Sequence, residues 1–147
     1  ARAYANTEAR GELVAALEEA RVGYGEDPVG YNAWLVAFYL AHLGDRDEAA
    51  EWLEKSAVDF RENARNLTDR AGEDSLLQAF LYATIGDKDR AFEWLELAFD
   101  LRSVGLQDLY RRDYRFAELW SDERYEDLMR RRGFPEEVII SLRPARK

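Results

Sequence analysis

The chain has 147 residues, of which 47% are hydrophobic and 13% aromatic, so it is too apolar for a disordered chain and long enough to bury a core. Its formal net charge is −9, and an acidic protein repels nucleic acid and anionic lipid. No run of 18 apolar residues is present to cross a membrane. The absence of cysteine excludes disulfides, thiol nucleophiles and cysteine-based zinc sites.

The sequence begins with Ala1 and not with methionine. Removal of an export signal after a small residue, trimming of an initiator methionine, or a start point chosen for expression would each leave such a start. We favour an exported protein, periplasmic or extracellular, over a cytoplasmic one.

The first predicted helix runs from Glu12 to about Tyr24 and ends at two glycines. Its apolar residues, which share one face at helical spacing, are Leu13, Ala16, Leu17 and Ala20. The segment before it is short for a complete leading helix, and Gly11 is either a turn or a weak point within one longer helix. Asp27-Pro28 predicts the start of the next helix, because proline is tolerated in the first turn, where its missing N–H is not needed.

The second predicted helix, residues 29 to 43, is apolar nearly all round. Such a helix packs between neighbours or lines a binding surface. Its partner helix is expected from residue 45 to about residue 66.

The polar segment 63 to 73, which carries Gly72, is predicted to form an extended helix end and a surface loop. Asp74 or Ser75 is expected to cap a helix over residues 76 to 85. Residues 88 to about 102 then complete this second helix pair.

An internal repeat generates these pairs. GDRDEAAEWLE, residues 44 to 54, returns as GDKDRAFEWLE, residues 86 to 96, and the copies match at 11 of 18 positions from Ala37 and Ala79 onward, with a constant offset of 42. In each copy a glycine ends one helix in a left-handed conformation, and Asp45 or Asp87 caps the next helix. A small alanine follows five residues after each glycine, which lets two helix backbones approach closely.

A weaker copy precedes these two, with Gly11, Ala16 and Pro28 in the same frame and a spacing of 33 from Gly11 to Gly44. With this spacing and a period of about 34 residues, the chain resembles the tetratricopeptide repeat (TPR) family over most of residues 1 to 103. The resemblance implies an all-α, right-handed TPR-type solenoid of about three helix pairs with a C-terminal helical cap. In this single domain we expect an incomplete first repeat over residues 1–29, a second repeat plus loop over 30–72, a third over 73–103, and the cap and tail over 104–147.

Beyond Ser103, DYRFAEL (113–119) and DERYEDL (122–128) share the frame D-x-R-aromatic-x-x-L, and we predict two brief helices with acidic caps. Gly133-Phe134-Pro135 should stop the second, and residues 136–142 should form a last helical turn or two. Residues 84–135 resemble the C-terminal TPR module of bacterial winged-helix regulators, nucleotide cyclases and Ser/Thr kinases, where the module is non-catalytic and serves protein contacts. This sequence carries no such effector domain, so their regulatory role is not carried over.

The resemblance also implies a binding surface, because the second, fifth, ninth and thirteenth residues of each leading helix face a concave groove. These residues are Tyr31, Trp34, Phe38 and His42 in one repeat, and Glu73, Leu76, Phe80 and Thr84 in the next. TPR domains that clamp a C-terminal carboxylate use lysine and asparagine where Trp34 and Phe38 stand, so that activity does not carry over. An aromatic groove suits an apolar or helical segment of a partner. The alternatives are that the stripe is ordinary core, or that the chain's own C-terminal segment fills the groove.

No other site is expected. His42 is the only histidine, and the Asp pairs at 45/47 and 87/89 are better explained as helix caps than as calcium loops. We therefore predict no metal, no cofactor and no enzymatic activity, since no Ser/His/acid arrangement is present. The run Arg130 to Arg132 lies in the last turn of a helix, where positive charge is favourable, and we prefer this interpretation to a nucleic-acid patch.

The predicted function is a non-catalytic protein–protein interaction scaffold, with a protein partner or other copies of itself, no nucleic acid and no membrane insertion. The alternative is a structural subunit that self-associates end to end into a homo-oligomer or filament. An incomplete first repeat would expose apolar surface, and the ends differ in charge, since residues 1–100 carry 10 basic and 21 acidic side chains and residues 101–147 carry 11 and 9.

Overall fold

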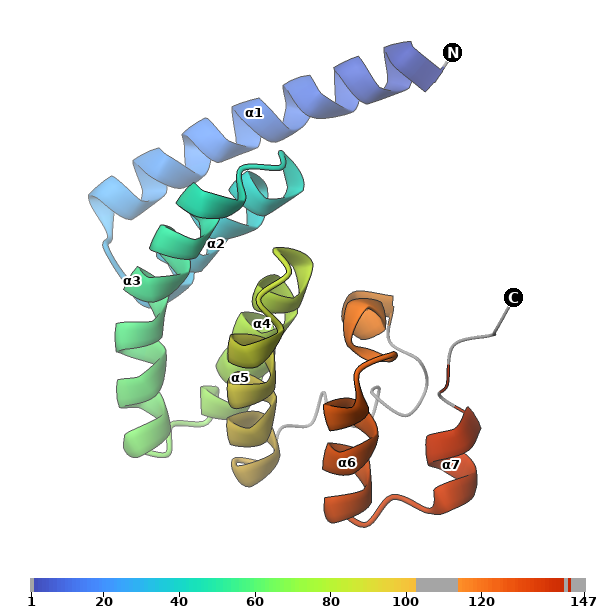
Figure 1. Cartoon of the computed structure of the whole chain (residues 1–147). Helices are drawn as coiled ribbons and strands as arrows, with labels where there is room; N and C mark the ends of the chain where they lie inside the picture. The colour runs from blue at the N-terminus through green and yellow to red at the C-terminus, as the bar shows by residue number, and fades with distance from the viewer. Residues whose placement is uncertain (1, 103–113, 142, 144–147) are drawn as a thin grey trace. The chain divides into compact units, whose positions relative to one another are not determined.

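The structure is a computed structural model that describes residues 2–102, 114–141 and 143 (Figure 1). Every regular element in these residues is a helix and none is a strand, which confirms the all-α prediction. The chain divides into two compact units, residues 1–62 and 63–147.

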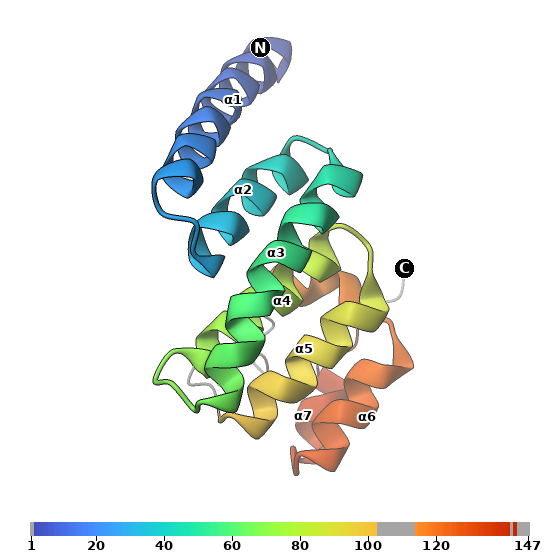
Figure 2. The ribbon, with the colours of Figure 1, turned by 90° about the vertical axis from the view of Figure 1, so that its left-hand side faces the viewer.

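The first unit contains α1 (Arg2–Glu26), α2 (Gly30–His42) and most of α3 (Arg46–Arg65) (Figures 1 and 2). The Arg21 guanidinium of α1 pairs with Glu48 in the first turn of α3 at 2.7 Å. One turn further along both helices, the rings of Tyr24 and Trp52 meet edge to face at 4.8 Å. Because residue numbers rise together at these contacts, α1 and α3 run parallel, and α2 lies between them in sequence as the antiparallel element.

The start of the chain forms one continuous helix. Gly11 lies in the middle of α1, so the interpretation of a weak point within a longer helix is confirmed, and the turn is wrong. The predicted helix over residues 29 to 43 is confirmed to within one residue at each end, since α2 spans Gly30–His42. Pro28 precedes its first turn, and the N-cap residue Val29 provides no side-chain cap.

A carboxylate from α3 caps α2 instead. The Gly30 N–H donates to Asp59 Oδ2 at 2.6 Å, which satisfies one of the amides that the first turn of a helix leaves unpaired. The two helices approach so closely here that a Cβ at Gly30 would lie 2.8 Å from Asp59 Cβ. Sequence reasoning missed this cap because donor and acceptor are 29 residues apart.

The second unit is built around the antiparallel pair α4 (Ala71–Thr84) and α5 (Lys88–Asp100). The 3₁₀ helix η2 (Tyr114–Leu119) packs against α4, α6 (Glu123–Arg131) against α5, and α7 (Glu136–Ser141) against α6 (Figure 2). The largest fully buried apolar side chains of this unit are Leu81, Leu95, Phe116, Leu119, Tyr125, Leu128, Met129 and Ile139.

The predicted loop over residues 63–73 is too long. Helix α3 extends to Arg65, as the extended helix end predicted, but α4 already begins at Ala71, and Gly72 is buried in its first turn. Asp74 and Ser75 therefore lie inside α4 and do not cap it. The Ser75 hydroxyl donates to the Ala71 carbonyl at 2.8 Å, which is how a serine inside a helix satisfies its polar group.

The two turns of the internal repeat have the same geometry. The Gly44 N–H donates to the Ala41 carbonyl at 3.1 Å, and the Asp45 N–H donates to the Leu40 carbonyl at 2.9 Å. Forty-two residues later, both hydrogen bonds recur at the same lengths, and the glycine has φ +87° in both copies. This pair of bonds is the Schellman motif, whose left-handed position glycine adopts without a Cβ penalty.

The acidic caps of the repeat are also confirmed. Asp45 accepts from the Glu48 N–H and Asp87 from the Arg90 N–H, both at 3.2 Å. Further along, Asp122 caps α6 by accepting from the Arg124 N–H at 2.9 Å. The first of the two C-terminal frames forms a 3₁₀ helix, and its predicted cap at residue 113 lies outside the described residues.

The burial of the Asp74 carboxyl leads to a prediction about stability and pH. Its carboxyl is buried in α4, and desolvation raises its pKa above the usual value, against the opposing influence of Arg70. Because the pKa is higher in the folded protein than in the unfolded chain, ionisation of Asp74 destabilises the folded protein at pH values above the folded pKa. This destabilisation disappears as the pH falls below the unfolded pKa of about 4. We expect Asp74→Asn to raise the melting temperature at pH 7, with the gain shrinking toward pH 4 in thermal scans; a gain that grew on acidification would contradict this.

Candidate functional site

The predicted aromatic residues of α2 form a continuous ladder in the first unit. The Tyr31 and Trp34 rings stack with centroids 6.0 Å apart, and Trp34 and Phe38 follow at 5.5 Å. The His42 ring lies 4.2 Å from Phe38, and its Nδ1 donates to the Phe38 carbonyl at 2.8 Å. The spacing of three, four and four residues therefore places all four side chains on one face, as predicted.

The four side chains of this ladder differ in exposure. Tyr31 is 45% exposed and His42 is exposed, whereas Phe38 is half-buried and Trp34 is only 6% exposed. The two ends of the ladder can thus contact another molecule, while Trp34 supports them from within. Whether the ladder binds a partner stays a prediction.

The corresponding residues of α4 lie in the second unit and are more covered. Leu76 is buried, Phe80 and Thr84 are half-buried, and the Thr84 hydroxyl donates to the Phe80 carbonyl at 2.9 Å. The C-terminal element η2 packs against this helix, which is the kind of contact that the self-filled alternative requires. An aromatic ladder like that of α2 does not form here, because Leu76 and Thr84 replace a tryptophan and a histidine.

The arginine run at the end of α6 is paired with the chain's own acids. The pairs are Arg130–Glu136 (2.8 Å), Arg131–Asp127 (2.9 Å), Arg131–Glu96, Arg132–Glu96 (3.2 Å) and Arg132–Asp100 (2.7 Å). Hydrogen bonding from Arg130 lowers the pKa of the Glu136 carboxyl. Arg131–Asp127 lies within α6, and the other four pairs connect the end of α6 to α5 or α7. This favours the structural interpretation of the run over a nucleic-acid patch.

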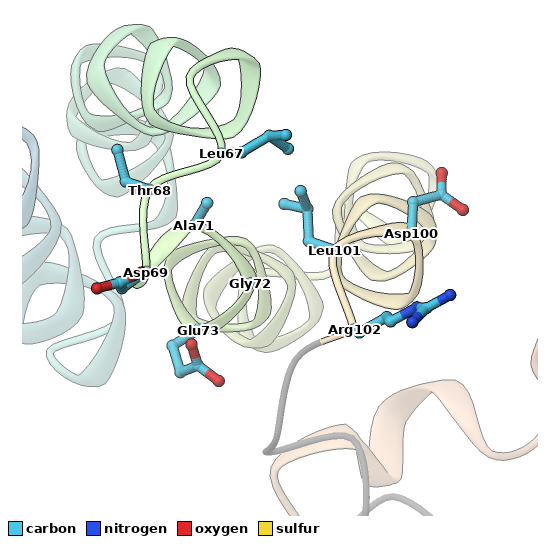
Figure 3. Close-up of a pocket in the computed structure, with 9 residues that line it drawn as sticks. All are labelled: Leu67, Thr68, Asp69, Ala71, Gly72, Glu73, Asp100, Leu101 and Arg102. Carbon is cyan, nitrogen blue, oxygen red and sulfur yellow. The ribbon is translucent and has the colours of Figure 1, made fainter.

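A hollow of about 250 Å³ lies in the second unit, where α3 ends, α4 begins and α5 ends (Figure 3). Its lining residues are Leu67, Thr68, Asp69, Ala71, Gly72, Glu73, Asp100, Leu101 and Arg102. Figure 3 shows the Leu67 and Leu101 side chains converging over it, with Ala71 to one side on α4. The hollow therefore has apolar walls and a charged rim.

The internal repeat shows how the second copy differs from the first at this place. At the offset of 42, Gly72 corresponds to Gly30 and Leu101 corresponds to Asp59. In the first copy the Asp59 carboxylate binds the Gly30 N–H, but leucine offers no acceptor, and no side chain caps α4. The second copy thus lacks the contact that joins the two helices in the first.

Two residues of the hollow have left-handed backbones without being glycine. Leu67 has φ +52° and Arg102 has φ +54°, whereas Gly44, Gly86 and Gly133 take this conformation at other helix ends. A side chain in the left-handed region costs about 1 kcal/mol relative to glycine. Sequence reasoning missed this site, because no local signal marks a leucine or an arginine as left-handed.

Comparison of the chain with models of protein families, with curated proteins and with solved structures found no significant match. The TPR resemblance therefore stays a prediction from the residues. In residues 2–102, 114–141 and 143, no helix has both the length and the apolar character needed to cross a membrane. Within the same residues, no cluster of three or more His, Asp or Glu side chains is arranged to hold a metal ion.

Proposed function

We propose that the protein is a non-catalytic interaction scaffold that binds an apolar or helical segment of a partner protein along the aromatic ladder of α2. The observation that carries this proposal is the ladder itself, with an exposed aromatic ring at one end and an exposed imidazole at the other. Aromatic side chains that are held rigidly supply much of the energy of protein interfaces.

A TPR-type solenoid is the architecture that we propose for this scaffold. Two observations support it. The first is the repeated turn with identical hydrogen bonds. The second is the packing in the second unit, where η2 packs against α4 and α6 packs against α5. In this interpretation η2 and α6 form a short fourth helix pair, which extends the C-terminal cap predicted from the sequence. The right-handed stacking of such pairs would leave the leading helices on one concave side.

Partner binding can be tested without a known partner. We expect peptides selected from a random displayed library on the purified protein to be rich in apolar residues and to bind Tyr31→Ala about tenfold more weakly by calorimetry. Circular dichroism should show unchanged helicity, since Tyr31 is exposed. Val58→Ala is the matched control, because Val58 is an exposed apolar residue of α3 in the same unit; equal binding to Tyr31→Ala and to this control would reject the ladder as the site.

End-to-end self-association is the second candidate, and the exposed face of α1 favours it. Val22 is 59% exposed there, beside Ala15 and Gly23, along an open hollow of about 500 Å³ that acidic side chains border. A neighbouring copy that covered this surface would form a heterologous contact. Sedimentation velocity over a range of concentrations tests it, since a monomer at every concentration would exclude this assembly.

A further inference from the structure

We propose that the hollow between the ends of α3 and α5 and the start of α4 receives one apolar side chain of a partner protein, flanked in that partner by lysine or arginine. The hollow belongs to the second unit (Figure 3). It is separate from the α2 ladder of the first unit, so this inference goes beyond the proposed function and either can fail without the other.

The size of the hollow lies below the usual range for a small-molecule site. Small-molecule sites usually enclose about 300–1,000 Å³, and this hollow encloses about 250 Å³. Its walls are the side chains of Leu67, Ala71 and Leu101. A branched aliphatic or methionine side chain fits both this volume and this lining.

Leu67 gives the strongest reason to expect an occupant. Its left-handed backbone is one that glycine adopts at lower cost. Its side chain is also 74% exposed, so burial within the chain does little to offset that cost. An apolar side chain from a partner, packed between Leu67 and Leu101, would bury this exposed leucine.

The charge around the hollow favours basic residues on either side of the partner's apolar side chain. Three acidic residues and one arginine line the hollow, namely Asp69, Glu73, Asp100 and Arg102. Figure 3 shows their charged ends directed outward, away from Leu67 and Leu101, where the residues next to an inserted side chain would lie. Asp100 also accepts from Arg132 at 2.7 Å, while Asp69 makes no ion pair within the described residues. The C-terminal ends of α3 and α5 add partial negative charge, against the partial positive charge at the start of α4. The balance is negative, which disfavours an acidic segment.

Titration of the 15N-labelled full chain by NMR tests the proposal. The probes are acetyl-Ala-Lys-Leu-Lys-Ala-amide, its Glu-flanked counterpart, and a version with serine in place of leucine. Burial of one side chain corresponds to a dissociation constant on the order of 10 mM or weaker, so titration continues to about 100 mM peptide. We expect saturable shifts at the amides of Leu67, Ala71 and Leu101 with the Lys-Leu-Lys peptide, and at least fivefold weaker binding of the other two.

Variants of Leu67 separate binding from folding. Leu67→Gly relieves the left-handed strain, so it should raise the melting temperature and abolish the peptide shifts, while Leu67→Met should keep them. Asp69→Asn should weaken binding at low salt and reduce its salt dependence. Equal or tighter binding of the Glu-flanked peptide, unchanged binding to Leu67→Gly, or no saturable shift at these amides would each overturn the proposal.

Discussion

Replacing Trp94 by alanine is expected to lower the free energy of unfolding by about 3–5 kcal/mol, the range for large aromatic side chains in cores. Trp94 is 2% exposed and precedes Leu95, which is fully buried. The same change at Trp52, its counterpart in the other copy of the repeat, should cost about 1–2 kcal/mol, since a half-buried side chain leaves a smaller cavity and loses less buried area. Urea unfolding followed by circular dichroism measures both losses.

The reason for the difference is the surroundings of Trp52. Its ring lies against Tyr24 and under the Lys55 ammonium, which is 4.0 Å from the ring centroid. Contacts of this kind contribute about 0.5–1 kcal/mol at exposed sites. Equal losses of unfolding free energy at the two tryptophans would mean that both side chains are equally buried. That result would contradict the different exposure of Trp52 and Trp94 in the structure.

Replacing Gly30 by alanine should destabilise the protein by about 2 kcal/mol, which is within the usual cost of overpacking. The new Cβ would lie 2.8 Å from Asp59 Cβ and 3.2 Å from the Ser56 carbonyl oxygen. Moving α3 away to relieve this clash would lengthen the 2.6 Å hydrogen bond that caps α2. Thermal and urea unfolding are the measurements.

Gly11→Ala is the matched control for this experiment. Gly11 is also inside a helix, but a Cβ there would meet no atom within 4 Å. Alanine should therefore stabilise α1 by about 1 kcal/mol, the difference in helix propensity. The same substitution is expected to have opposite signs at the two positions. Stabilisation by Gly30→Ala would mean that α2 and α3 do not approach each other as closely as the structure places them.

The site was only partly predictable from the sequence. Helical spacing alone placed Tyr31, Trp34 and Phe38 on one face, and the structure places their rings in one ladder. Spacing could not reveal that Trp34 is 6% exposed while Tyr31 is 45% exposed, because exposure depends on packing against elements distant in the chain. The hollow at Leu67 and Leu101 was missed for the same reason.

Local chemistry in the sequence was sufficient to determine the helical class, the repeated turn at Gly44 and Gly86, and the caps at Asp45 and Asp87, because each involves residues at most a few positions apart. Tertiary structure alone decided which carboxylate caps α2. The start of α4 at Ala71 likewise could not be predicted from the sequence, since neither Asp74 nor Ser75 caps it. A hydrogen bond such as that from Gly30 to Asp59 joins residues 29 positions apart, and such a partner is chosen by the packing of helices, which no local pattern encodes.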